Sequence, residues 1–375
     1  MTTAEIGRKA TGYSADHAAD QVKLSKELYA YKQSCDYQLR GAEAMKSKSV
    51  GDIKEVVDEK FGHILAEVGD WKGWESHSGE EQEKLLECLI NEVCVHFGKL
   101  AFAELPEILQ RIVGLWHWSG CCMHKDLNTF KGGAARLSAF WKEAGIKGPV
   151  KLLSRQKEEL VGADVTDGEL DVGSGGAAKL ADLVGALVRN KEETKGFPDE
   201  FRTYSMTHLA YEISFPDTSN IRYQCYGDAA TELIWHPDFY IGFLNQHGKK
   251  KKRGAGLNHM EMNILKGLQD PETRTKLAVF ALYSEAISKP YAITVRGSYN
   301  ESKNALDLGP DHLKIITHID TLIKNPDLLI GDQPSHETGA LYGTCWDQDI
   351  INHIHSIRNQ LPYLQQALVA FLQGA

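Results

Sequence analysis

Apolar residues recur every three or four positions through most of this 375-residue chain, which is the spacing of one face of an α-helix. One such stripe runs from Leu24 to Leu39 and predicts a helix that extends to about Met45, and similar stripes cover 53–68 and 85–97. Ser78, followed three positions later by Glu81, has the pattern of a capping box at the start of the third helix. Helices with one apolar face must pack on one another, so the sequence predicts a mostly α fold built of helical layers.

A small β component is expected beside these helices. The segments 148–153 and 211–216 are short, apolar and bounded by glycine or proline, and each is predicted to be a strand. Between them, residues 161–176 are acidic, rich in glycine and almost free of large apolar side chains, which is typical of a flexible linker. We therefore expect a helical domain over 1–160, a linker over 161–176 and an all-helical domain over 177–375.

Charge and cysteine content narrow the classes of function. The formal net charge is −9, so attraction to nucleic acid or to an anionic membrane has to come from a local patch. The seven cysteines are an odd number and two are adjacent, which argues against a disulfide framework and for a reducing compartment. No secretory signal and no membrane-length apolar run is found in the sequence, so we expect an intracellular protein, nuclear or cytoplasmic, without membrane contact.

Two cysteines and a histidine are grouped in "GCCMHKDLN" (120–128), shortly after a second histidine. On a continuous helix, His117, Cys121 and His124 would share one face and could hold zinc, with Cys122 as a further candidate ligand. That helix would have to run through Gly120, which disfavours helix. The alternative is that these side chains form part of the core, because free cysteine is commonly buried.

The same stretch resembles the CxxH motif of hAT-superfamily DNA transposases, in which a Leu-Asn pair follows the histidine. Cys121 and His124 match the motif, and Leu127 and Asn128 match the pair one residue late. A second landmark of that family is similar to "FPDTSNIRYQCYGDAATELI", in which Thr218, Arg222, Tyr223 and Ala229 fall into comparable places. The chain is also similar, over nearly its whole length, to large fungal proteins that look transposon-derived.

The resemblance implies a partial RNase H-like core with an inserted all-helical domain. Such transposases cut DNA with three carboxylates that hold two divalent metal ions, so magnesium is implied as a cofactor beside zinc. By position, Asp16 is the candidate for the second catalytic acid, since it follows the short "TGYSA" and precedes a long helix. The alternative role for Asp16 is the N-cap of that helix.

The chain also departs from the family pattern. The first acid would lie before the present sequence and the third would lie after the helical insertion, so the resemblance implies a central piece of a transposase or a descendant without its nuclease. We therefore expect a transposase-like, catalytically incomplete protein that binds nucleic acid or a protein partner. DNA is the expected ligand, and self-association stays open.

Five consecutive basic residues in a glycine-flanked run supply the local patch that DNA binding would need. These residues are Lys249, Lys250, Lys251, Lys252 and Arg253. They predict phosphate contacts without sequence reading, or a nuclear localisation signal, and Arg222 is a further candidate contact.

Two other classes of function remain open from sequence alone. One is an enzyme that uses the Cys-His cluster as metal ligands or uses a cysteine as a nucleophile, with His124 lowering the thiol pKa. The other is a helical scaffold without chemistry.

Overall fold

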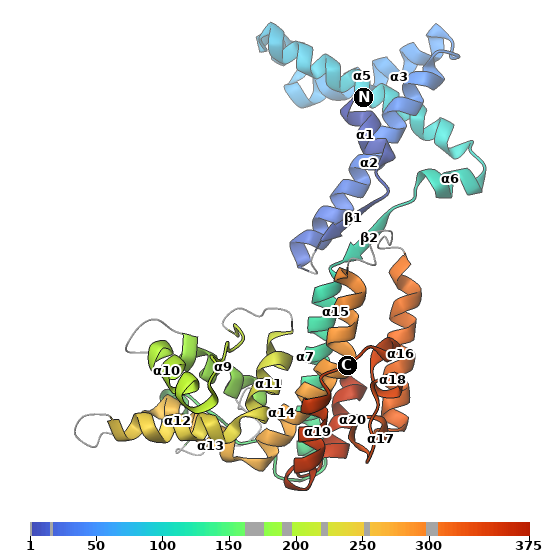
Figure 1. Ribbon diagram of the computed structural model, residues 1–375. Helices are drawn as coiled ribbons and strands as arrows, with labels where there is room; N and C mark the ends of the chain where they lie inside the picture. Colours follow the sequence, from blue (N-terminus) through green and yellow to red (C-terminus); the bar gives the residue numbers. More distant parts are fainter. Residues whose placement is uncertain are drawn as a thin grey trace. The chain divides into compact units, whose positions relative to one another are not determined.

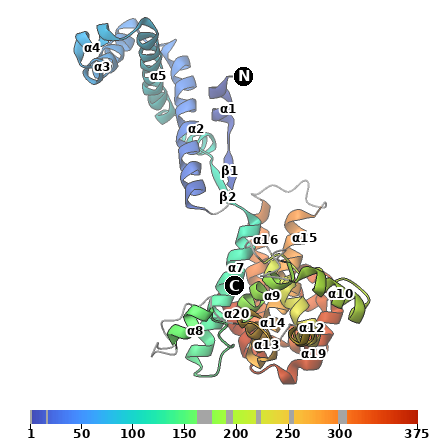
Figure 2. The same ribbon diagram turned by 90° about the vertical axis from the view of Figure 1, so that its left-hand side faces the viewer.

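The computed structural model describes residues 2–15, 18–161, 176–189, 197–218, 224–250, 256–297 and 307–375 (Figures 1 and 2). Over the described residues the chain is mostly helical with one two-stranded sheet, and the mostly α fold with a small β component that the sequence predicts is confirmed. It forms two compact units, residues 1–121 and 122–375. The sequence placed the boundary at 161–176 instead, and most of that segment lies outside the described residues.

The first unit is organised around two long helices. Its elements are α1 (Thr3–Lys9), β1 (Gly12–Ala15), α2 (Ala19–Met45), α3 (Val50–Val68), α4 (Asp70–Ser76), α5 (Gly79–Ala103), α6 (Glu107–Val113) and β2 (His117–Gly120). Helices α2 and α5 lie side by side (Figures 1 and 2). Their backbones approach through glycine: a Cβ atom at Gly41 would lie 1.7 Å from the carbonyl oxygen of Cys94, and one at Gly98 would lie 1.8 Å from that of Tyr37. Only glycine permits this close packing.

The helices predicted in this unit are confirmed, and their caps explain where they begin. Ser78 accepts a hydrogen bond from the Glu81 backbone, and the Glu81 side chain accepts one from the Ser78 backbone. Ser49 and Asp52 form the same capping box ahead of α3. The faces of α3 and α5 that the apolar stripes predicted pack together around Val56, Leu89 and Phe97.

The strands lie at positions other than the predicted ones. β1 pairs in parallel with β2, with Gly12 opposite His117 and Ala15 opposite Gly120. Parallel strands need a crossover connection, and α2 to α6 supply it. Residues 148–153 and 211–216 do not form strands, so those two predictions are wrong.

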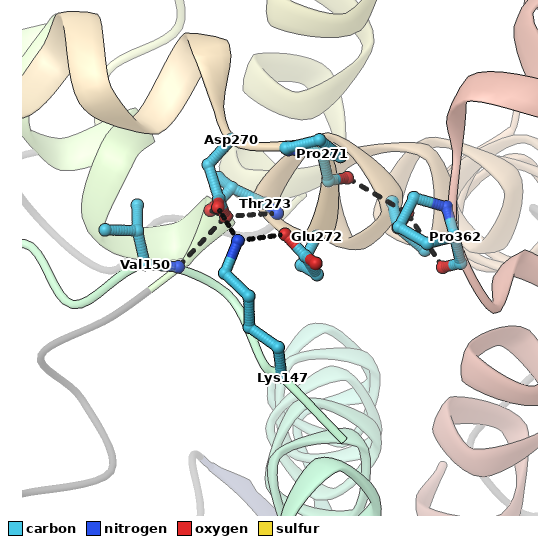
Figure 3. A network of polar contacts seen from close by, with 8 residues as sticks. Lys147, Val150, Asp270, Pro271, Glu272, Thr273 and Pro362 are labelled. Atoms are coloured by element: carbon cyan, nitrogen blue, oxygen red, sulfur yellow. Dashed lines mark hydrogen bonds and ion pairs between the residues drawn. The ribbon is translucent and has the colours of Figure 1, made fainter.

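The segment 148–153 is extended, with a single β-bridge residue at Lys151 and a 3.2 Å hydrogen bond from the Gly176 N–H to the Val150 carbonyl, and side chains supply further partners. The backbone N–H of Val150 donates to the Asp270 carboxylate at 3.0 Å, and the carbonyl of Leu153 accepts from the Asn263 side chain at 2.8 Å. Figure 3 shows these contacts of Asp270, together with the Lys147 ammonium, which donates to the carboxylates of Asp270 at 3.0 Å and Glu272 at 2.8 Å. Polar side chains of α13 and of the α14 N-cap therefore pair with backbone N–H and carbonyl groups of this extended segment.

The second unit packs its helices around one that is buried along most of its length. The helices are α7 (Cys122–Glu143), α8 (Arg155–Val161), α9 (Ala177–Arg189), α10 (Pro198–Leu209), α11 (Cys225–Trp235), α12 (Pro237–Lys250), α13 (His259–Gln269), α14 (Pro271–Tyr283), α15 (Lys289–Arg296), α16 (Leu308–Lys324), α17 (Asp327–Ile330), α18 (His336–Gly339), α19 (Gln348–Ile357) and α20 (Leu364–Gly374), with short 3₁₀ turns at Leu341–Gly343 and Arg358–Gln360. The buried helix is α14, against which α11 and α20 pack, while α20 also packs on α7 (Figure 1). Among the helices that the structure describes, none combines the length and the apolar character needed to cross a membrane.

A π-helix, Ser284–Ser288, separates α14 from α15. The backbone N–H of Lys289 donates to the carbonyl of Ser284, five residues back. Pro290 follows directly, and a proline ring would clash with the carbonyl four residues earlier in a regular α-helix. The widened turn removes that clash, and π-turns of this kind are frequent at functional sites.

Candidate functional site

The four predicted metal ligands do not share a helix. His117 begins strand β2, and the backbone N–H of Cys121 continues the pairing with a 2.7 Å hydrogen bond to the Ala15 carbonyl. Helix α7 begins only at Cys122, with His124 in its first turn. The predicted continuous helical face is therefore wrong, because the chain is extended through Gly120.

Zinc binding by these residues stays a prediction. Within the described residues, no group of three or more His, Cys, Asp or Glu side chains is placed to hold a metal ion. Elemental analysis of the protein and of a Cys121→Ser, His124→Ala double variant tests the assignment. Loss of about one zinc per chain in the variant would support a metal site, whereas a less stable variant with unchanged metal content would assign these side chains to packing.

The candidate catalytic acid of the sequence is Asp16. Asp16 lies outside the described residues, directly after the end of β1 at Ala15. The alternative role, N-cap of the long helix, is wrong, because the N-cap residue of α2 is Ala18.

The basic run is described only at its start. Lys249 and Lys250 form the end of α12, and Lys250 lies 3.2 Å from the Glu200 carboxylate. Lys251, Lys252, Arg253 and Arg222 lie outside the described residues.

A site that the sequence did not predict centres on Asp126. This residue lies on α7, two positions after His124, and is only 6% exposed. The Ser288 hydroxyl, in the π-helix, donates to its carboxylate at 2.7 Å. Burial raises the pKa of Asp126, and the hydrogen bond from Ser288 offsets part of that rise. Buried carboxyl groups of raised pKa are characteristic of binding and catalytic sites.

Further polar residues, from the π-helix and from the start of α11, lie around Asp126. A small pocket beside Asp126 is also lined by Ser284, Gln224 and Tyr226. The Ser284 hydroxyl is buried and has no hydrogen-bond partner among the described residues. The Gln224 amide donates to the Ser288 carbonyl at 2.9 Å. An unpaired buried hydroxyl costs free energy, and this one lies at the pocket beside Asp126.

Asp126 also lines a larger pocket of about 220 Å³. Lys125, Asp126 and Thr129 line it from α7, and His312 and Ile315 line it from α16. Tyr283 and Tyr291 also line this pocket, and the Tyr291 hydroxyl is hydrogen-bonded to His312 Nε2 at 3.1 Å. Burial lowers the pKa of His312, and the charge of Lys125 lowers it further. The imidazole is therefore favoured in its neutral form.

A charged contact fixes the π-helix that carries Ser284 and Ser288. The Glu285 carboxylate is buried, pairs with Lys289, and accepts a 3.0 Å hydrogen bond from the Asp347 backbone. Glu285 therefore joins the π-helix that carries Ser284 and Ser288 to the N-cap residue of α19.

The CxxH motif covers Cys121 and His124, and Asp126 lies two residues beyond it on α7. Its partner Ser288 is 162 residues away in sequence, so no local pattern joins the two. The available signal was "SEAISKP" (284–290), in which polar residues and a proline interrupt a long apolar helix pattern.

The chain matches no protein-family model, and comparisons with curated proteins and with solved structures give no match.

Proposed function

We propose that this chain is a transposase-like protein that binds DNA through its basic run. The observation that carries the proposal is the parallel pair β1–β2, in which the candidate acid Asp16 follows one strand and the CxxH residues follow the other. In a parallel sheet the carboxyl ends of the strands meet at one edge, where ligand and metal sites are commonly built. A parallel pair with a helical crossover is also what a partial RNase H-like core would contain.

The distribution of charge directs DNA toward the second unit. Residues 1–121 contain 14 Lys and Arg against 20 Asp and Glu, so the first unit as a whole repels phosphate. In the second unit the run 249–253 is the densest group of positive charge in the sequence. Phosphate contacts from such a run give affinity without sequence preference, and the same run fits a nuclear localisation signal.

Substituting Lys249, Lys250, Lys251 and Lys252 by alanine is expected to weaken binding to a duplex of mixed sequence. Non-specific binding is typically about 10⁻⁴ to 10⁻⁶ M at physiological salt, and each lost phosphate contact lowers the slope of log affinity against log salt by about 0.9. We expect the slope to fall by about 2 to 4 and the affinity at low salt to fall by about tenfold or more. Fluorescence anisotropy over a salt series measures both quantities.

A matched control removes the same charge elsewhere. Four exposed lysines of the first unit serve for this: Lys26, Lys54, Lys72 and Lys99. Their substitution by alanine should leave the salt slope unchanged within error. Equal losses in both variants, or no binding by the parent protein, would contradict the proposed DNA contact.

A further inference from the structure

The larger pocket beside Asp126 has one polar and one apolar wall. The polar wall is a single face of α7, where Lys125, Asp126 and Thr129 lie within one helical turn. The apolar wall is formed by isoleucines of α16, among them Ile315 and Ile319. Pockets built in this way hold a ligand body by burial and fix its orientation by a few polar groups.

The size and the aromatic residues favour a flat, compact ligand. The volume of about 220 Å³ is below the range of about 300 to 1,000 Å³ that is usual for drug-sized ligands. Tyr283 and Tyr291 are both buried, and both line the pocket beside the isoleucines. Aromatic and branched side chains pack well on planar rings in offset or edge-to-face arrangements.

The polar side chains that line this pocket combine a basic and an acidic group, which favours a ligand with both donors and acceptors over a simple ion. Lys125 is half-buried and has no ion-pair partner among the described residues, while Asp126 supplies a carboxyl group at the adjacent position of α7. The lowered pKa of His312 leaves its imidazole neutral, so it adds no charge to the lysine. Ala375 also lines the pocket. The Lys125 ammonium and the Asp126 carboxyl group thus stand beside the Thr129 hydroxyl, whose oxygen can accept although its proton is donated to the Lys125 carbonyl at 2.9 Å.

We propose that this pocket binds a neutral, planar heteroaromatic molecule of nucleobase size, whose ring packs against the isoleucines and tyrosines and whose mixed donor and acceptor edge faces Lys125, Asp126 and Thr129. A free nucleoside and an unpaired base of a single strand share this chemistry. The proposal stands apart from the DNA contact of the basic run, since none of the pocket residues belongs to that run.

Binding of adenosine, guanosine, cytidine and uridine to the full chain is measured by isothermal titration calorimetry. We expect saturable binding of at least one nucleoside, and a weaker response to 2-naphthoate, which matches the ring size but carries a charge and lacks the mixed edge. Lys125→Ala and Thr129→Val are each expected to weaken nucleoside binding about five- to tenfold, because each removes one hydrogen-bonding group. Ile315→Trp, which fills the pocket, should abolish binding.

Lys131→Ala is the matched control, because Lys131 is exposed on the same helix and does not line the pocket. Circular dichroism melting of every variant separates loss of the site from loss of the fold. Absence of nucleoside binding, tighter binding of 2-naphthoate than of nucleosides, or pocket variants that bind like Lys131→Ala would overturn the proposal. If a single-stranded oligonucleotide competes with the nucleoside for the pocket and its duplex does not, the natural ligand is an unpaired base. The variant with Lys249, Lys250, Lys251 and Lys252 replaced by alanine should bind nucleosides as the parent does.

Discussion

Replacing Lys276 with methionine is expected to raise the free energy of unfolding at pH 7 by about 2 to 4 kcal/mol. Lys276 lies on α14, is 6% exposed, and has no ion-pair partner among the described residues. Its Nζ lies 5.7 Å from the centre of the Phe280 ring, a contact that compensates only in part. Burial lowers the pKa of Lys276 to about 8, which is the signature of an ammonium group that the folded protein solvates poorly.

The pH dependence gives a second readout. Below the folded-state pKa of about 8, Lys276 is charged in both the folded and the unfolded protein, and burial of the charge destabilises the fold. Between pH 8 and the unfolded-state pKa of about 10.4, the folded protein loses this proton while the unfolded protein keeps it. The free energy of unfolding therefore increases with pH in this range. The difference in stability between Lys276→Met and the parent should therefore shrink from pH 8 to pH 10. Urea unfolding monitored by circular dichroism measures this difference, in which other titrating groups largely cancel.

Two variants test the explanation. Lys324→Met alters an exposed lysine of α16 and should change stability by less than about 0.5 kcal/mol. Lys276→Arg keeps a charge that cannot be removed, so it should be less stable than the parent and should lose the rise above pH 8. A destabilised Lys276→Met variant would mean that the ammonium is well paired in the folded protein.

Helices of the first unit were predictable because their signals are local. Ser78 and Glu81 are three residues apart, and the stripe from Leu24 to Leu39 needs only the helical period. Strands β1 and β2 carried no such signal. "GYSA" and "HWSG" are only four residues long, and each depends on a partner about a hundred residues away.

The two wrong strand predictions arose because a local strand signal was present where no strand forms. The segment 148–153 has strand-like composition, but Pro149 removes one backbone donor and the N–H of Val150 pairs with a carboxylate 120 residues distant. Local propensity identified an extended backbone there correctly, yet it could not identify which group would pair with it.

The Asp126 site could be approached from sequence only as far as the CxxH motif. An aspartate early in a helix normally indicates a favourable interaction with the helix N-terminus, and nothing nearby in sequence predicts that Asp126 is buried. Lys276 is similar, since "ETRTK" reads as the solvated first turns of a helix although it lies in the core. Burial of single charged residues is decided by tertiary packing, which local patterns do not encode.

Replacing Asp270 with alanine is expected to lower the free energy of unfolding of the protein by about 3 kcal/mol. Asp270 is the N-cap of α14: its carboxylate accepts from the Thr273 backbone at 2.9 Å and from the Thr273 hydroxyl at 2.7 Å (Figure 3). Loss of the cap accounts for about 1 kcal/mol, and most of the remainder comes from the Val150 N–H, which loses its acceptor. The contact with Lys147 adds little, because that lysine side chain is 67% exposed.

The pH dependence of this variant runs in the direction opposite to that of Lys276→Met. Burial acts to raise the pKa of Asp270, but hydrogen bonds from Thr273, Val150 and Lys147 outweigh it and hold the pKa below its ordinary value. The stabilisation is therefore present above the unfolded pKa of about 3.9 and is lost as the pH falls through the folded value. Urea titrations at pH 7 and pH 3 should show a smaller difference between parent and variant at the lower pH. Glu272→Gln alters only the ion pair with Lys147 and should lower the free energy of unfolding by less than about 1 kcal/mol at either pH. If Asp270→Ala and Glu272→Gln lowered it equally, the effect would belong to the ion pair and not to the helix cap.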